Sequence, residues 1–114
     1  MVRTIVCTSV ALVLSFSVAS PARAQSAKEK GGKIFVDQKC TLCHSVAGKG
    51  NVKGPLDDVG SRLSQADIRA WIVDAKAMTA KTKAPRKPEM KAYTLPKEEL
   101  DALVAYLSTM KKSR

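Results

Sequence analysis

The chain has 114 residues, of which 45% are hydrophobic, and a formal net charge of +10, so it holds one domain at most. Only 4% of the residues are aromatic, and a chain of this size buries about 60–65% of its unfolded surface, so its own side chains build only a small core. Such domains rely on a disulfide, a metal or a cofactor for stability. The N-terminus predicts export, which argues against nucleic acid as a partner despite the positive charge.

The N-terminal segment has the pattern of a secretory signal peptide. Arg3 supplies a positive charge, residues 4–18 are predominantly apolar, and Ala24 ends a run of small residues suited to cleavage. The apolar run is shorter than the about 20 residues of a membrane span, although an uncleaved anchor stays open as an alternative. We therefore predict a signal peptide over 1–24, a domain over 25–114 and a periplasmic location. The mature chain keeps 18 cationic and 10 anionic side chains, a balance of +8.

The first half of the mature chain predicts a short helix and a loop. Residues 25–30 are polar and are expected to fray, whereas residues 33–39 predict a short helix that runs directly into Cys40. Residues 45–54 contain three glycines and almost no apolar periodicity, which is typical of a loop. A further short helix fits residues 56–63.

The second half predicts two longer helices on either side of a loop. Ser64 begins a pattern that resembles a capping box, and apolar residues at helical spacing predict a helix over 65–78. Residues 79–95 contain two prolines and many charges, so we expect an extended loop. Pro96 suits the start of a last helix that two lysines, Lys111 and Lys112, would close. The apolar stripe of that helix is Leu100, Leu103, Val104 and Leu107. The predicted class is all-α, with three main helices and one or two short ones.

One motif carries the chemistry. The sequence Cys40-Thr41-Leu42-Cys43-His44 fits C-x-x-C-H, the attachment pattern of haem c. Two intervening residues let both thiols reach one edge of a porphyrin, and the adjacent imidazole then lies where it can bind iron. We predict one haem c, bound covalently through Cys40 and Cys43, with His44 on the iron. The haem would also supply the apolar surface that the chain lacks.

Three other interpretations of the two cysteines are weaker. A structural zinc site needs about four ligands, and the mature chain offers only Cys40, Cys43 and His44 in one short stretch. A thioredoxin-like dithiol would need a βαβ setting that the helical pattern does not provide. A plain disulfide between such close residues would constrain little chain and would leave the histidine unexplained. Cys7 lies in the predicted signal peptide and is assigned no role.

Over residues 31–112 the chain resembles a class I cytochrome c. Gly32 and Phe35 precede the haem motif as in the N-terminal helix of that family, where a glycine allows close crossing of the C-terminal helix. Residues 103–107 resemble that partner helix, and Gly54-Pro55 resembles the glycine-proline pair that follows the haem motif. The resemblance implies the cytochrome c fold, with its helices wrapped around one covalently bound haem.

The resemblance also implies particular haem contacts. In the family a proline carbonyl accepts a hydrogen bond from the proximal histidine, which assigns that role to Pro55 toward His44. The sixth ligand is a methionine in the loop before the last helix, where this chain has Met90. Lys91 is a departure, since the family often has proline after the methionine. Trp71 resembles the tryptophan that donates to a haem propionate in many relatives, and packing in the core is the equally weighted alternative.

Other sixth ligands stay open. Met78 and Met110 compete with Met90, as does an open sixth position, although methionine usually fills gaps in a core. We expect Tyr93 and Tyr106 to pack and not to bind iron. A thioether favours Fe(II), so ligation by histidine and methionine would raise the reduction potential relative to two nitrogen ligands.

The resemblance implies a monomeric electron carrier that works by outer-sphere transfer and is not an enzyme. A merely solvated surface is one explanation of the positive charge. Basic residues crowd the distal loop, however, which favours electrostatic steering of the protein onto redox proteins with acidic docking surfaces. A membrane or periplasmic oxidoreductase would be such a partner. The crowded residues are Lys81, Lys83, Arg86, Lys87 and Lys91. A haem sensor or peroxidase-like enzyme with an open sixth position is one competing function. A fixed subunit of a larger oxidoreductase is another.

Overall fold

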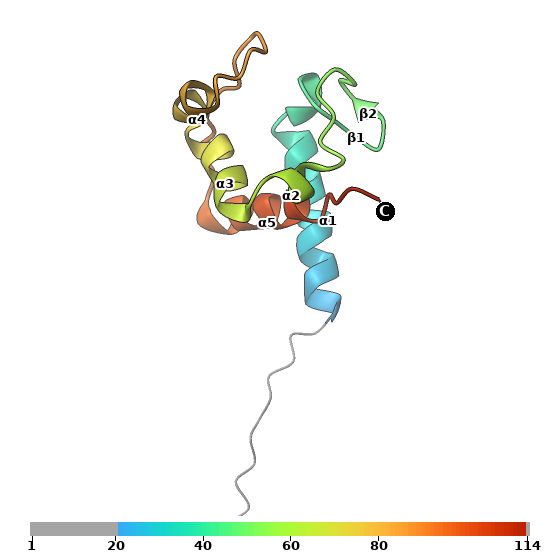
Figure 1. Ribbon diagram of the computed structural model, residues 1–114. Helices are drawn as coiled ribbons and strands as arrows, with labels where there is room; N and C mark the ends of the chain where they lie inside the picture. Colours follow the sequence, from blue (N-terminus) through green and yellow to red (C-terminus); the bar gives the residue numbers. More distant parts are fainter. Residues whose placement is uncertain (1–20, 114) are drawn as a thin grey trace, which may run out of the picture.

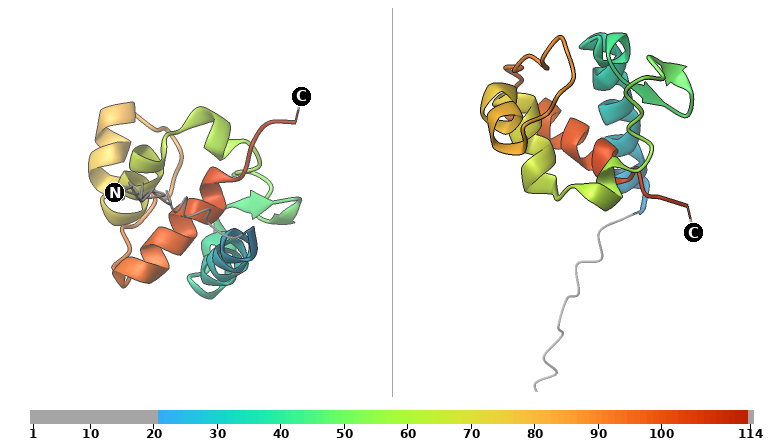
Figure 2. Two further views of the ribbon diagram at one scale, coloured as in Figure 1. Left: turned by 90° about the horizontal axis from the view of Figure 1, so that it is seen from below. Right: turned by 45° about the horizontal axis from the view of Figure 1, so that its top comes forward.

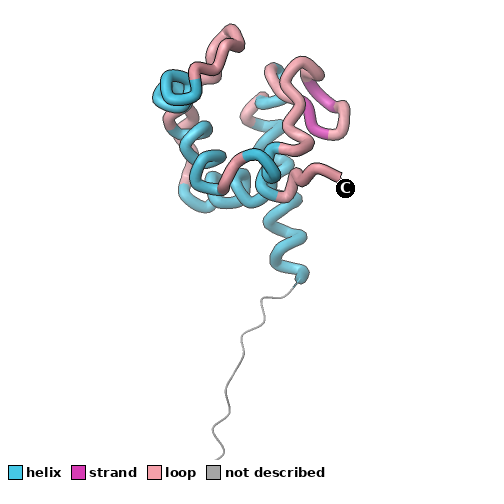
Figure 3. Tube along the Cα trace, viewed as in Figure 1, coloured by secondary structure: helices cyan, strands magenta, loops and turns pink. Residues whose placement is uncertain are grey.

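The structure is a computed structural model that describes residues 21–113. Most of the predicted signal peptide therefore lies outside the described residues. Within the described range, no helix combines the length and the apolar character needed to cross a membrane. The elements in chain order are α1 (Pro21–Asp37), the 3-10 turn η1 (Cys40–Leu42), β1 (Ser45–Val46), β2 (Lys49–Gly50), α2 (Val59–Arg62), α3 (Gln65–Val73), α4 (Ala75–Thr82) and α5 (Lys97–Ser108). The predominantly helical class is as predicted, with one small antiparallel hairpin added (Figure 3).

Helix α5 is the centre of the fold. It packs against α1, α2 and α3, so elements from both ends of the described chain meet on it. In Figure 1, α3 and α4 rise above one end of α5, while η1 and the hairpin lie above its other end; both views of Figure 2 also show these two groups apart from each other. The buried core is built from α1, α2, α3 and α5 and consists of Ile34, Phe35, Val59, Ile68, Ile72, Ala102, Leu103, Val104 and Leu107.

The crossing of α1 over α5 depends on one glycine. A Cβ atom on Gly31 would overlap the carbonyl oxygen of Ala102 and the Cβ of Tyr106, and it would lie 3.0 Å from the Ala102 carbonyl carbon. A Cβ on Gly32 would lie 3.3 Å from the edge of the Tyr106 ring. The glycine that allows the close approach is therefore Gly31, and the assignment to Gly32 was wrong by one position. The Phe35 and Tyr106 rings continue the contact, with centroids 6.1 Å apart.

Helix α1 is longer than the sequence predicts. It begins at Pro21 and continues through residues 25–30, which we expected to fray. An ion pair of 2.5 Å joins Lys30 in α1 to Glu98 in the first turn of α5, so this end of the segment contacts the last helix. The expectation of fraying was wrong because it considered only the polar composition of the segment and not its contact with the last helix.

The predicted helix over 65–78 is two helices. Ser64 caps α3 by accepting a hydrogen bond from the Asp67 amide at 3.1 Å, as the capping pattern predicts. Asp74 then ends α3 and begins α4, where its carboxylate accepts a hydrogen bond from the Ala77 amide at 3.3 Å. Helix α4 continues to Thr82, so the first residues of the predicted loop are helical. The distal segment, residues 83–95, follows.

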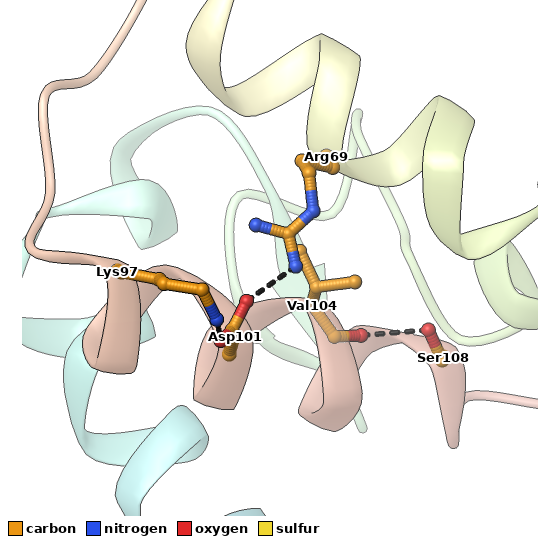
Figure 4. A network of polar contacts seen from close by, with 5 residues as sticks. All are labelled: Arg69, Lys97, Asp101, Val104 and Ser108. Carbon is orange, nitrogen blue, oxygen red and sulfur yellow. Dashed lines mark hydrogen bonds and ion pairs between the residues drawn. The ribbon is translucent and has the colours of Figure 1, made fainter.

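Two polar networks fasten neighbouring helices to α5. Arg69 of α3 and Lys97 of α5 both pair with Asp101, at 2.5 and 2.6 Å (Figure 4). Beyond the end of α5, the Gly60 amide of α2 donates to the Met110 carbonyl at 2.8 Å, and Lys111 donates to the Gly60 carbonyl. Lys111 therefore does not close the helix as expected, because α5 ends at Ser108 and the lysine binds α2.

Candidate functional site

The proximal turn, residues 40–44, brings both cysteines and the histidine together. Lys39 has left-handed backbone angles (φ 58°), which end the path of α1 and start η1. The amides of Cys43 and His44 both donate to the Cys40 carbonyl, at 3.2 and 2.9 Å. Both thiols are unpaired, Cys43 exposed and Cys40 half-buried. Burial raises the pKa of the Cys40 thiol. The turn therefore presents two free thiols and an imidazole from five consecutive residues.

The ring of His44 is held by a backbone carbonyl. Its Nδ1 lies 3.1 Å from the carbonyl oxygen of Gly54, not from that of Pro55 as the resemblance implied. The reason is the local pairing of strands: the Ser45 amide donates to the same Gly54 oxygen at 3.1 Å, and the Leu56 amide donates to the Ser45 carbonyl at 2.9 Å. This pairing turns the Gly54 carbonyl toward the imidazole. Burial lowers the pKa of His44, which favours the neutral ring that ligates iron.

Asn51 donates hydrogen bonds to the backbone of the proximal turn, and the sequence did not predict this role. Its amide N–H lies 3.0 Å from both the Thr41 and the His44 carbonyl oxygens, and its side-chain Nδ2 donates to the Leu42 carbonyl at 3.1 Å. Gly50, with a φ of 107°, lets the chain approach, since a Cβ there would overlap the His44 carbonyl oxygen. An asparagine after a glycine-rich turn is the one signal that could have indicated this contact.

The distal segment contains Met90 and is anchored to α3. The Tyr93 amide donates to the Ile72 carbonyl of α3 at 2.8 Å, which anchors the segment, and Met90 is half-buried. Lys91 places its ammonium 5.1 Å from the centre of the Tyr93 ring. Burial raises the pKa of Tyr93, and the charges of the two cysteines raise it further. Ligation of iron by Met90 stays a prediction.

The other sequence candidates lie in different surroundings. Met110 belongs to the contact between α2 and the end of α5, and Met78 is buried in α4. Trp71 on α3 is half-buried, but it is not among the described side chains that pack against the core cluster. Tyr93 and Tyr106 do pack against that cluster. Trp71 is therefore only partly buried and lies outside the core cluster.

The residues of this site fit haem c. Covalent attachment and proximal ligation need two unpaired thiols separated by two residues and an imidazole whose Nδ1 is hydrogen-bonded, and the site supplies both. Within residues 21–113, no cluster of three or more His, Cys, Asp or Glu side chains is arranged to hold a metal ion by itself.

Comparisons with known proteins agree with this site. The family model described as Cytochrome c matches residues 28–111. The chain is also 29% identical, over 91 residues, to cytochrome c oxidase subunit 2 of Alkalihalophilus pseudofirmus; the match covers 72% of this chain and 25% of that protein. The chain thus spans about a quarter of the length of this curated relative. No solved structure matches the chain. The match over residues 28–111 shows that the chain belongs to the cytochrome c family, which indicates a haem c cofactor and a role in electron transfer.

Proposed function

We propose that this protein is a soluble periplasmic electron carrier with a single haem c. Cys40 and Cys43 hold the haem covalently, His44 is the proximal iron ligand and Met90 is the distal ligand. The observation that carries the proposal is the proximal turn, in which two unpaired thiols flank one helical turn and the Gly54 carbonyl fixes the adjacent imidazole.

The chain's own residues prepare the site for electron transfer. His44 donates its Nδ1 proton to the Gly54 oxygen, which fixes the tautomer and leaves Nε2 free to ligate. Asn51 holds the backbone of the turn from the other side, so the imidazole has little freedom to rotate. When bound, haem supplies a one-electron couple between Fe(III) and Fe(II). A thioether from Met90 would favour the reduced state.

The surface beside the proximal turn suits a redox partner with acidic groups. Leu42 and Val52 are 70% and 68% exposed next to the exposed Cys43, and the bond from Asn51 to the Leu42 carbonyl keeps their segments together. No acidic residue occurs between positions 38 and 56. Three exposed lysines occur in the same stretch of the chain: Lys39, Lys49 and Lys53. Complementary charge would raise the association rate, and that rate would fall as salt is added.

The test is the spectrum of protein exported together with a haem c maturation system. A low-spin spectrum with a sulfur-to-iron band in the oxidised form is expected. The double substitution of Cys40 and Cys43 by alanine should abolish haem that stays with the chain on a denaturing gel, and retained haem would refute covalent attachment.

Substitutions of three methionines test whether Met90 is the distal ligand. Met90→Ala should remove the sulfur-to-iron band and lower the reduction potential. Met78→Leu and Met110→Leu, which keep the side-chain volume nearly constant, should retain both. An unchanged spectrum in Met90→Ala would show that Met90 is not a ligand. Binding of carbon monoxide by the wild-type protein would favour the sensor or peroxidase-like function, because a firmly bound methionine resists displacement.

A second candidate function is that of a fixed subunit in a larger oxidoreductase. The similarity to part of a cytochrome c oxidase subunit 2 favours it, because in that protein the matching region is one part of a longer chain. Purification from the native membrane and periplasmic fractions distinguishes the two. A stoichiometric partner that withstands high salt supports the subunit, whereas a free monomer supports the carrier.

A further inference from the structure

Arg86 joins two segments that lie far apart in the sequence. It belongs to the distal segment, yet its guanidinium lies against the backbone of Gly54. A Cβ atom on Gly54 would overlap Nη1 of Arg86 and would lie 2.9 Å from its Cζ. The same Cβ would overlap the carbonyl oxygen of Cys43, so the guanidinium lies beside the proximal turn, at the residue whose carbonyl oxygen holds the imidazole.

The charge of Arg86 is not neutralised by a carboxylate in the described part of the chain. The cations in the ion pairs of residues 21–113 are Lys30, Lys33, Arg62, Arg69, Lys87 and Lys97. The adjacent Lys87 pairs with Glu89, and Arg86 is left without such a partner.

We propose that Arg86 is a positioning residue that holds the distal segment, which contains Met90, against the Gly54 backbone beside His44. Its positive charge favours reduced iron. This inference rests on the proposed function, because it needs haem on His44. The alternative for an exposed arginine is simple solvation. The contact with Gly54 argues against that alternative, because it joins the distal segment to a residue that holds the His44 ring.

Two physical effects follow from this placement. A positive charge near the iron site destabilises Fe(III) more than Fe(II), and partial burial of the site weakens solvent screening. The planar guanidinium also offers several donors in a fixed fork above a glycine backbone, whereas lysine would offer a mobile point charge. Arginine therefore supplies both a charge and a rigid contact, and substitutions can separate the two.

The experiment compares wild type, Arg86→Ala, Arg86→Lys and the control Lys81→Ala, all as holoproteins. Lys81 is exposed near the end of α4 and has no ion-pair partner among the described residues, so its substitution removes the same charge. The first readout is the midpoint potential. The second is the rate at which added imidazole abolishes the sulfur-to-iron band.

Arg86→Ala should lower the potential more than Lys81→Ala and should speed displacement several-fold. Arg86→Lys should keep most of the potential but show fast displacement. If Arg86→Ala and Lys81→Ala give the same midpoint potential and the same displacement rate, the proposal is overturned. If the wild type carries haem without the sulfur band, ligation by Met90 fails, and the potentials alone then decide on the charge of Arg86. A wild type without covalent haem refutes the proposed function, and the inference about Arg86 fails with it.

Discussion

The contact of Gly31 with α5 gives the sharpest test of the fold. A methyl group at this position would overlap the Ala102 carbonyl oxygen and the Tyr106 Cβ, neither of which lies at the end of a flexible side chain. Carbon atoms in contact prefer about 3.5–4.0 Å, so α1 and α5 would have to separate. Overpacking of this kind costs about 1–3 kcal/mol, and a backbone obstacle belongs near the top of that range. The better helix propensity of alanine offsets about 1 kcal/mol.

We therefore expect Gly31→Ala to lower the free energy of unfolding by about 2 kcal/mol. Gly32→Ala is the matched control, because its methyl group meets only the edge of the Tyr106 ring and the propensity gain is the same. It should change stability by less than about 1 kcal/mol. For a domain of this size, the difference corresponds to about 10–15 °C in Tm, measured by far-UV circular dichroism of the holoproteins. Equal stability of the two variants, or a larger loss in Gly32→Ala, would refute the placement of Gly31.

Three further changes test other parts of the structure. The ion pairs lower the pKa of Asp101, first through Lys97, so this carboxylate stabilises the fold above its unfolded pKa of about 3.9, and the contribution is lost as pH falls through the lower folded value. Asp101→Asn should therefore flatten the loss of Tm in acid, and an unchanged acid profile would contradict the ion pairs. Ser64→Ala removes the cap of α3 and should cost about 1 kcal/mol in urea unfolding with an unchanged m value. Gly50→Ala should lower Tm far more than Gly48→Ala, because both glycines have positive φ but only Gly50 lies against the His44 carbonyl; similar losses would argue against that contact.

Local chemistry explains which parts of the site the sequence predicts. Cys40, Cys43 and His44 are close together in the sequence, and one turn suffices to bring them together, so spacing alone indicates their role. The hydrogen-bond acceptor of His44 was predicted within one residue. Its identity depends on strand pairing at Ser45, which orients the Gly54 carbonyl, and no residue type in the sequence encodes that orientation.

Other features depend on contacts between distant segments. The apolar spacing of residues 65–78 continues across the break at Asp74, so periodicity predicted one helix where the aspartate caps a second one. The choice between Gly31 and Gly32 depends on the register of α1 on α5, which only packing determines. Arg86 was counted among the exposed cations of its loop, and its contact with Gly54 links positions that no local pattern relates.

The pairing of α1 with α5 has a consequence for the order of events during synthesis and folding. These helices lie at opposite ends of the described chain, so their contact closes a loop that contains the proximal turn, the hairpin and the distal segment. Closing so long a loop has an entropic cost and makes folding depend on non-local contacts. Until the last helix arrives, α1 lacks the partner that buries its apolar face. Cys40 and Cys43 therefore stay on an open chain until α5 is complete.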